Sequence, residues 1–340
     1  MKNGKITIHD IAKELNIDSS TVSRALSNNS RVTQKTKDKI LEKAKELGYQ
    51  RNVLASNLRQ NKTNTIGVIV PRISRHFFSS VIAGIEETAY EADYNVIICQ
   101  TLEQLNREKK IIQTLSANRV DGVLISISME TQNDSNFQIF HKNKTPIVFF
   151  DRHFDSSKNS NVIIDDFKSA YKATEHLILQ GCKKIAHFSG PQELMIYKNR
   201  FNGYKSALEK HKILFDENLV INSKLMESDG AESAKKILSF GSVDGIFSAN
   251  DNAAIGAMKY LKGEGINIPE DIAIVGFSNE PISSVIEPSL TTIDQPGFEM
   301  GKIATTLLIS QINEKLEPHP PKTIILESLL IERNSSKKIK

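Results

Sequence analysis

The chain has 340 residues, enough for two or three domains with a sizeable buried core. Apolar residues make up 39% and charged residues 25%, which excludes a mainly disordered chain, and no apolar run is long enough to predict a membrane span. The net charge of +4 conceals an asymmetry, because residues 1–62 hold thirteen basic and six acidic side chains (+7) and the remaining residues carry −3. This pattern favours contact of the N-terminal segment alone with nucleic acid or another anionic surface, over a merely uneven solvated surface.

Three short helices are predicted in the first 50 residues. Thr7 with Asp10 three residues later is typical of a helix N-terminus, Asp18 predicts the start of a second helix, and Thr33 that of a third, which Gly48 ends. The spacing of apolar residues gives each helix one buried face. In the third helix this face consists of Ile40, Leu41, Ala44 and Leu47. Two short helices joined by a tight turn and followed by a third are typical of a helix-turn-helix.

The outward face of the second predicted helix carries small hydroxyl side chains and one arginine. It consists of Ser19, Ser20, Thr21, Ser23 and Arg24. Small side chains let a helix approach the floor of the DNA major groove, where the planar guanidinium of Arg24 can donate to O6 and N7 of guanine. The alternative is a three-helix bundle without a DNA role, which the arginine on an otherwise small face disfavours.

These residues carry a longer pattern, which resembles the LacI/GalR family of bacterial transcriptional regulators. The head of the pattern is Thr7–Ala12 followed by Ser20–Leu26. The similarity continues through Gly48-Tyr49, Asn52, Ala55, Leu58, Ile66–Val70, Val120-Asp121-Gly122, Asn250-Asp251, Gly276-Phe277 and Leu290–Pro296. It therefore covers nearly the whole chain.

The resemblance implies a DNA-binding domain over residues 1–51 and a hinge helix and linker over 52–64. In the family, the segment matching Asn52–Arg59 becomes helical on operator DNA, and Leu58 would wedge into a minor-groove base step. Arg51 departs from the pattern, since many relatives have proline there. The alternative for this segment is a plain polar linker, for which Val53, Leu54 and Leu58 are too apolar. The expected DNA-binding residues are Thr7, Ser19, Ser20, Thr21, Ser23, Arg24, Asn28, Arg31, Asn52, Ala55, Leu58 and Arg59.

From Ile66 onward, short apolar runs alternate with helical periods, which predicts βαβ units around parallel sheets. A first set of strands is predicted at Ile66–Val70, Asn95–Cys99, Val123–Ile127 and Ile147–Phe150. A second set is predicted at Val162–Ile164, Ile185–Ser189, Ile246–Ser248 and Ile274–Phe277. The resemblance implies a periplasmic-binding-protein-like effector-binding and dimerisation domain over 65–340, whose chain crosses between two subdomains near Ser160, Thr292 and Thr323. The expected N-subdomain spans 65–160 and 293–322, and the expected C-subdomain spans 161–291 and 323–335.

Polar and aromatic side chains follow several of the predicted strands. Ligands of open α/β sheets bind outside the carboxyl ends of the strands, so these side chains predict the effector pocket. The expected effector-binding residues after strands are Phe77, Phe78, Asp151, Arg152, Asn250, Asp251, Ser278 and Asn279. The resemblance adds Arg200, at the start of a predicted helix, and Gln295. Planar polar groups rimmed by phenylalanine suit a polyhydroxylated ligand. Ser278 departs from the family pattern, because sugar-responsive relatives often carry aspartate there. Leu194 lies where the purine-responsive relative has a second arginine, and it therefore disfavours a purine ligand.

The sequence contains no recognisable nucleophile, metal-ligand, phosphate-loop or dinucleotide motif, so no catalytic residue, metal or cofactor is predicted. We expect a transcriptional regulator, a repressor that binds a palindromic operator as a homodimer under control of a carbohydrate-like effector. The alternatives are control by a phosphorylated partner protein or a non-sugar metabolite, or a cytosolic solute-binding or sugar-modifying protein. The polar N-terminus and the presence of only two cysteines predict a cytoplasmic, nucleoid-associated protein that does not bind a membrane.

Overall fold

The computed structural model describes residues 6–27, 30–49, 62–154, 159–241, 243–313 and 320–337. The chain divides into two compact units, Met1–Thr63 and Asn64–Lys340. We call them the head and the body, and each is described by itself. No helix in the described ranges is both long enough and apolar enough to cross a bilayer.

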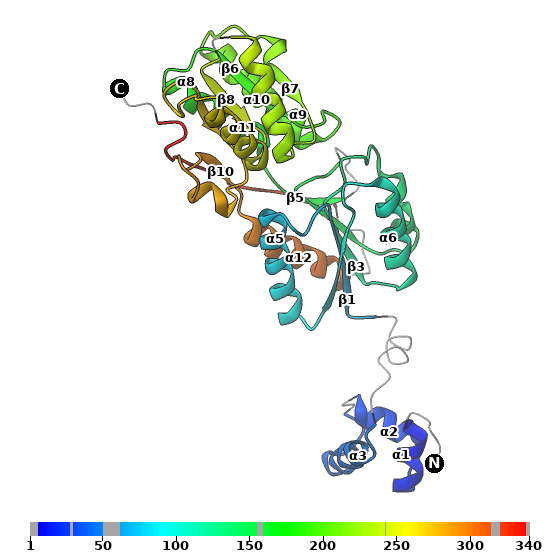
Figure 1. Ribbon diagram of the computed structural model, residues 1–340. Helices are drawn as coiled ribbons and strands as arrows, with labels where there is room; N and C mark the ends of the chain where they lie inside the picture. The colour runs from blue at the N-terminus through cyan, green and yellow to red at the C-terminus, as the bar shows by residue number, and fades with distance from the viewer. Residues whose placement is uncertain are drawn as a thin grey trace. The chain divides into compact units, whose positions relative to one another are not determined.

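The head holds three described helices: α1 (Ile8–Leu15), α2 (Ser19–Leu26) and α3 (Gln34–Glu46) (Figure 1). The helix starts are those that the sequence predicts. The carboxylate of Asp10 accepts from the backbone N–H of Thr7 at 2.8 Å, and that of Asp18 accepts from Ser20 N at 2.7 Å. Each helix buries one face, so that Ile11, Val22 and Ile40 meet in a small core. The prediction for Leu41 was wrong: this side chain is 51% exposed, because its position on α3 turns it away from the two shorter helices.

The N-subdomain of the body is a parallel sheet flanked by helices. Its six described strands, in spatial order, are β11 (Thr323–Leu326), β5 (Ser160–Ile164), β4 (Ile147–Phe150), β3 (Gly122–Ile125), β1 (Thr65–Val70) and β2 (Asn95–Gln100). The flanking helices are α5 (His76–Glu91), α6 (Leu105–Ala117), α7 (Gln138–Lys142) and α12 (Gly297–Asn313), with the 3-10 turn η1 (Asp134–Phe137). Figure 1 shows α5 and α12 together on one side of the sheet and α6 on the other.

The C-subdomain repeats the plan with a smaller parallel sheet. Its strands within the described ranges are, in spatial order, β7 (Val220–Asn222), β6 (Ile185–Ser189), β8 (Gly245–Ser248) and β9 (Ala273–Val275). Its helices are α8 (Asp166–Leu179), α9 (Met195–Lys210), α10 (Glu227–Ser239) and α11 (Asp251–Gly263), with 3-10 turns η2 (Glu217–Leu219) and η3 (Pro281–Ser284). Two further strands, β10 (Thr292–Asp294) and β12 (Leu329–Ile331), form an antiparallel pair.

The structure moves two of the expected crossings between subdomains. The strand predicted at Val162–Ile164 was expected in the second set, but in the structure it is part of β5, which pairs with β4 in the six-stranded sheet. The strand after Lys322 likewise pairs with β5 in that sheet. The chain therefore leaves the N-subdomain after Ile164 and again after Leu326, not near Ser160 and Thr323. A short apolar run such as Val162–Ile164 does not indicate the sheet that it joins, because its partner β11 is remote in sequence.

The pairing of α5 with α12 depends on two glycines. A Cβ atom on Gly84 would lie 2.1 Å from the carbonyl oxygen of Phe298, and one on Gly301 would lie 2.1 Å from that of Val81. Both positions exclude any larger side chain, because backbone atoms occupy the space. This close packing fixes the N-terminal ends of both helices at the edge of the sheet where the strands end, which is where the cleft described below lies.

Candidate functional site

The predicted outward face of α2 is only partly exposed in the structure. Ser20 and Arg24 are exposed, whereas Ser19, Thr21 and Ser23 are half-buried. Asp18 holds the first turn through Ser20, so the hydroxyl groups are presented on a rigid, capped helix. Small polar groups around one exposed guanidinium give a surface that can enter a groove and donate to base edges.

Two other predicted contact residues of the head, Thr7 and Arg31, are exposed. Thr7 also donates its hydroxyl to Asp10 at 2.7 Å, so it caps α1 as well. The remaining predicted DNA contacts lie outside the described residues. They are Asn28, Asn52, Ala55, Leu58 and Arg59.

The body contains a cavity of about 500 Å³ between its two subdomains. Eight of the ten predicted effector residues line it, namely Phe77, Phe78, Asp151, Arg152, Arg200, Asn250, Ser278 and Gln295. They follow β1, β4, β8 and β9 or lie on α9 and before α12, so residues far apart in sequence meet at the carboxyl edges of two sheets.

Arg200 is the most firmly held of these side chains, and it is 3% exposed. Its Nε and Nη2 lie 2.8 and 2.7 Å from Oδ1 of Asp166, and its Nη1 donates to the carbonyl oxygen of Ala249 at 2.7 Å. The guanidinium carbon lies 3.6 Å from the ring centre of Phe277. Burial raises the pKa of Asp166 to about 6, despite the opposing effect of Arg200. The guanidinium is thus fixed in one orientation at the cavity wall.

A second buried arginine lies on the N-subdomain side of the cavity. Nη1 of Arg152 donates to both carboxylate oxygens of Glu103 at 3.1 and 2.9 Å, and Asp151 accepts from Ser126 Oγ at 3.1 Å. Burial raises the pKa of Asp151, and the charges of Arg152 and Arg200 oppose that shift. Nε of Arg152 is buried without a hydrogen-bond partner among the described residues. Oδ2 of Asp151 lies 3.8 Å from this nitrogen, within ion-pair distance but beyond that of a hydrogen bond.

Three polar residues that line this cavity have a positive φ, as do other non-glycine residues elsewhere in the described chain. Asp151 has φ +59°, Glu103 has φ +63° and Ser278 has φ +112°, all in the region that side chains other than glycine rarely adopt. Such conformations persist where the surrounding structure fixes them, and they gather at ligand sites. All three of these residues line the cavity.

The side-chain amides of Asn250 and Gln295 differ in how many of their hydrogen-bonding atoms already have partners. Asn250 uses both of its amide groups internally, because Nδ2 donates to Leu225 O at 3.0 Å and Oδ1 caps α11 through Ala253 N at 2.9 Å. Gln295 donates to Ser278 Oγ at 2.9 Å, and its Oε1 is buried without a partner among the described residues. Of these two lining residues, Gln295 rather than Asn250 therefore has a side-chain oxygen without a hydrogen-bond partner in the described ranges.

Two predicted effector residues do not line the cavity. The carboxylate of Asp251 is completely buried and accepts from Thr292 Oγ1 at 2.6 Å, Ser283 Oγ at 2.8 Å and Glu280 N at 2.8 Å. Burial raises its pKa to about 6, which these hydrogen bonds oppose. Through the hydrogen bond to Thr292, the carboxylate of Asp251 joins α11 to β10, where the chain crosses between the subdomains.

Asn279 is the other residue that lies outside the cavity lining. Its amide nitrogen donates to Asp294 Oδ1 at 2.8 Å, and its oxygen accepts from Arg333 Nη2 at 2.7 Å. Both its amide groups are thus used to join the loop after β9 to β10 and to the C-terminal segment. The position of Asn279 after β9 correctly indicated the carboxyl edge of the sheet. It did not indicate the direction in which the side chain points.

Sequence reasoning missed several lining residues that carry charge or a hydroxyl group. They are Arg72, Arg75, Glu103, Glu130, Tyr197, Lys224 and Glu280, and the amides of Gln104 and Asn252 were missed as well. Tyr197 could have been found, because it lies three residues before Arg200 on one helix and therefore shares its face. Lys224 follows β7, a three-residue strand too short to produce a periodic pattern. In the ranges that the structure describes, no three His, Cys, Asp or Glu side chains are grouped as metal ligands.

Two protein-family models match this chain. The model described as "Bacterial regulatory proteins, lacI family" matches residues 7–52, and the one described as "Periplasmic binding protein-like domain" matches residues 174–336. They correspond to the head and to much of the body.

Curated relatives match over almost the full chain. The transcriptional regulator RegA of Clostridium acetobutylicum is 36% identical over 336 residues, which cover 97% of this chain and 99% of the relative. The ribose operon repressor of Halalkalibacterium halodurans is 33% identical over 311 residues, covering 91% of each chain. Among solved structures, the complex of the transcriptional regulator CelR with cellobiose superimposes with a TM-score of 0.75 at 26% identity, covering 97% of this chain and all of that one.

Proposed function

This chain belongs to the LacI family of bacterial regulatory proteins, and from that premise we propose that it represses transcription by binding a palindromic operator as a homodimer, under the control of a carbohydrate-like effector. Members of the family are DNA-binding regulators rather than enzymes. Since bacterial operators lie on the nucleoid, we expect the protein to act in the cytoplasm.

The main support for control by an effector is that both subdomains contribute residues to the cavity wall. Phe77 and Arg152 come from the N-subdomain, whereas Arg200 and Ser278 come from the C-subdomain. A ligand that contacts both walls stabilises one relative arrangement of the subdomains over others. It can change operator affinity to the extent that it binds the two arrangements differently.

The polar and aromatic lining supports a hydroxylated ligand. Phe77 and Phe78 offer ring surface, while Gln295 Oε1 and Arg152 Nε offer an acceptor and a donor without partners. The matched relatives include a ribose operon repressor and a regulator bound to cellobiose, which supports a carbohydrate here. We propose that Arg200 holds ligand hydroxyls through the guanidinium protons that its internal partners leave unused.

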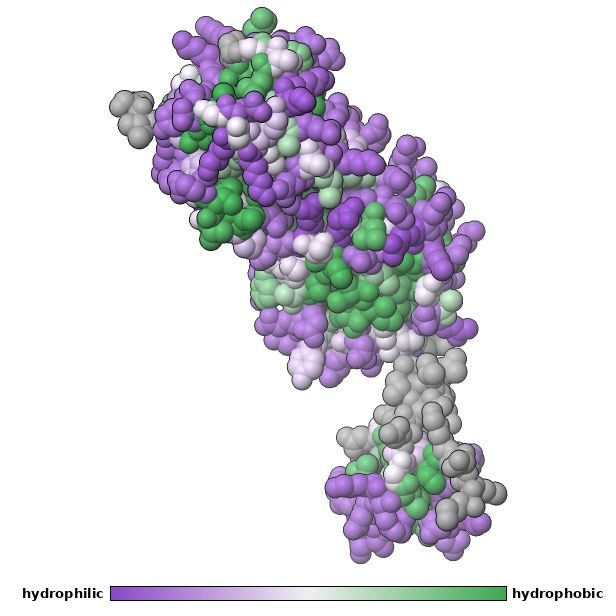
Figure 2. Space-filling model, in the orientation of Figure 1, coloured by the Kyte–Doolittle hydropathy of each residue, from purple (hydrophilic) through white to green (hydrophobic). Residues whose placement is uncertain are grey.

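Apolar side chains exposed on the body support the homodimer. The edge strand β2 exposes Ile97 and Ile98, and the η3 region exposes Ile282 and Val285, the last of these by 78%. Figure 2 shows apolar surface on one face of the body both near η3 and between α5 and α6. An open sheet edge flanked by apolar side chains favours association with another chain. A two-fold dimer presents two copies of α2, which suits a palindromic site.

The experiment that tests this function is selection from a pool of random DNA duplexes with the full-length protein. We expect enrichment of a sequence with two-fold symmetry, because two identical α2 helices read two half-sites. The bound species should contain two protein chains per duplex by light scattering. A pool that stays random after repeated rounds, while the protein remains folded by circular dichroism, would contradict the proposal. Enrichment of an asymmetric site by a single chain would contradict the homodimer alone.

A further inference from the structure

Three basic side chains line the cavity without a carboxylate partner: Arg72 and Arg75 from the N-subdomain and Lys224 from the C-subdomain. Within the described part of the chain, none of the three forms an ion pair within 4 Å. The four lining carboxylates are those of Glu103, Glu130, Asp151 and Glu280. Glu103 and Asp151 pair with Arg152, and Glu130 accepts from the backbone N–H of Leu105. The lining therefore holds five basic and four acidic side chains, and three of the basic ones have no ion-pair partner among the described residues.

The start of α5 adds positive potential at the same place. The first N–H groups of a helix have no acceptor within it, and they carry the positive end of the helix dipole. In α5 no side chain caps them, no acidic residue lies in the first turn, and the residue at the cap position is Arg75. Phe77 and Phe78 of this first turn line the cavity. A 16-residue helix whose N-terminus carries arginine in place of an acidic cap is complementary to an anion.

A buried side chain with an unused polar atom lies next to this helix start. Gln295 is 8% exposed, and a Cβ atom on Gly297, two residues after it, would lie 3.1 Å from the carbonyl oxygen of Phe77. Oε1 of Gln295 has no hydrogen-bond partner in the described ranges, and neither has Nε of Arg152. Unpartnered buried polar atoms are rare in native proteins, so both indicate that a polar ligand completes the cavity.

The basic groups face one another across the cavity. Nη2 of Arg75 lies 3.4 Å from Sδ of Met226, so a side chain of the N-subdomain reaches the C-subdomain two residues from Lys224. Like charges on opposing walls repel one another, and an anion between them converts that repulsion into attraction. The charge of a ligand would thus act directly on the relative position of the subdomains.

From these observations we infer that the effector is an anionic polyol, a sugar bearing a phosphate or carboxylate group. The anionic group binds Arg72, Arg75, Lys224 and the N-terminus of α5, while the hydroxylated ring lies against the inner wall that holds Arg200. Because the anion bridges the two subdomains, it stabilises the arrangement in which they lie close together. This inference rests on the proposed function of the cavity and names the chemical class of its ligand.

The test is calorimetry of the full-length protein at low ionic strength with pairs of ligands that differ in charge. The pairs are ribose with ribose 5-phosphate, glucose with glucose 6-phosphate, and glucose with glucuronate, and inorganic phosphate is titrated alone. In at least one pair we expect the anionic sugar to bind at least about tenfold more tightly than the neutral one. A charge-assisted hydrogen bond contributes a difference in affinity of this size. Phosphate and carboxylate sources are distinguished by which pair shows the difference. The preference should weaken as salt is added.

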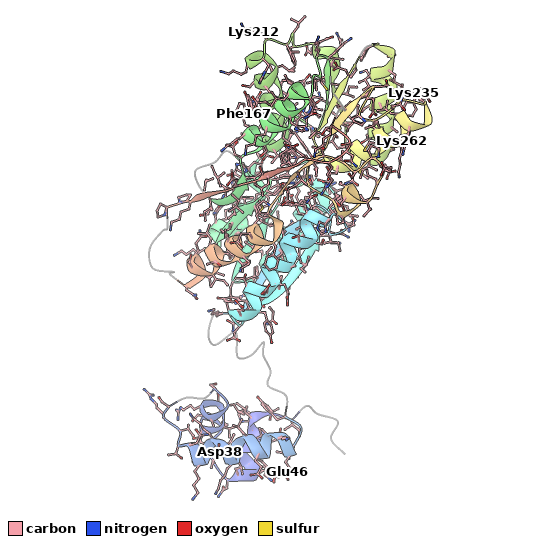
Figure 3. All side chains as sticks on the ribbon, turned by 90° about the vertical axis from the view of Figure 1, so that its left-hand side faces the viewer. Asp38, Glu46, Phe167, Lys212, Lys235 and Lys262 are labelled. Carbon is pink, nitrogen blue, oxygen red and sulfur yellow. The ribbon has the colours of Figure 1, made fainter. Side chains whose placement is uncertain are left out.

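The matched variants are Arg75→Gln with Lys224→Gln, and Lys235→Gln as the control. In the double variant we expect the anionic sugar to bind about as tightly as its neutral counterpart, so that the ratio of the two affinities falls close to one. Lys235 is an exposed lysine of α10 outside the cavity lining, labelled in Figure 3, and its variant should keep the full ratio.

Three outcomes would overturn the inference: neutral sugars binding as tightly as their anionic partners, a double variant that keeps the preference, or no binding by any anionic probe. None of these affects the duplex selection, which tests the proposed function separately.

Discussion

Replacing Arg200 with alanine is expected to abolish the response to effector and to lower the free energy of unfolding by about 3–5 kcal/mol, the usual effect of removing one partner of a buried ion pair. Asp166 would lose its charged partner, and Ala249 O would lose its donor. Thermal melts with and without ligand measure both effects. The loss of stability should diminish towards about pH 5, because Asp166, whose pKa burial already raises to about 6, then binds a proton.

Two further variants separate stability from ligand binding. The double variant Arg200→Ala with Asp166→Ala removes the stranded carboxylate, so it should be more stable than Arg200→Ala and still not respond to ligand. Lys198→Ala changes an exposed residue of the same helix outside the cavity lining, and it should behave as the unaltered protein. An Arg200→Ala protein whose operator binding still responds fully to ligand would remove Arg200 from the effector site.

Replacing Arg24 with alanine is expected to remove much of the discrimination between operator and random DNA. A bidentate contact from arginine to guanine contributes about 1–3 kcal/mol of discrimination per base, and a dimer makes it in both half-sites. Affinity for random duplex should change far less, because it depends on phosphate contacts. Fluorescence anisotropy at a fixed salt concentration measures both affinities and their ratio.

The control for Arg24 is Lys45→Ala, which removes one exposed basic residue from α3. If Lys45 contacts phosphate, its loss weakens operator and random DNA alike, so the ratio should stay within about twofold of its original value. If Arg24→Ala instead lowered both affinities equally, Arg24 would be a phosphate contact, and base reading would have to come from other residues of the head.

The head was predictable from sequence because its structure is local. Helix caps such as Thr7 with Asp10, and Asp18 before Ser20, act within three residues, so their pattern can be read directly. Leu41 shows the limit of this reasoning, since an apolar residue on a helix is buried only where another element covers it.

The sheets of the body were predictable as elements but not fully as a topology. The strand predicted at Val162–Ile164 exists as part of β5, but it was placed in the wrong subdomain, because its pairing with β4 and β11 is decided by tertiary contacts. The crossing strands β10 and β12 are three residues each and produce no periodic signal. Their pairing joins segments more than thirty residues apart, which a single sequence cannot indicate.

At the cavity, the rule that ligand residues follow strands found the correct edge of each sheet. It could not find the direction of each side chain, and so it included Asp251, whose carboxylate serves the crossing segment instead. It also missed the basic residues Arg72, Arg75 and Lys224, which line the cavity from opposite walls. Charge complementarity across a cleft becomes visible only when the two walls are placed in space.

The central claim is that the operator and a ligand in the cavity control each other's binding. The most direct measurement titrates the selected operator in the presence and absence of the ligand, and then the ligand in the presence and absence of the operator. Linkage requires the two affinities to change by the same factor, which we expect to lie in the range of about 5 to 150. A ligand that saturates the cavity, with binding that depends on Arg200, and leaves operator affinity unchanged would contradict the claim.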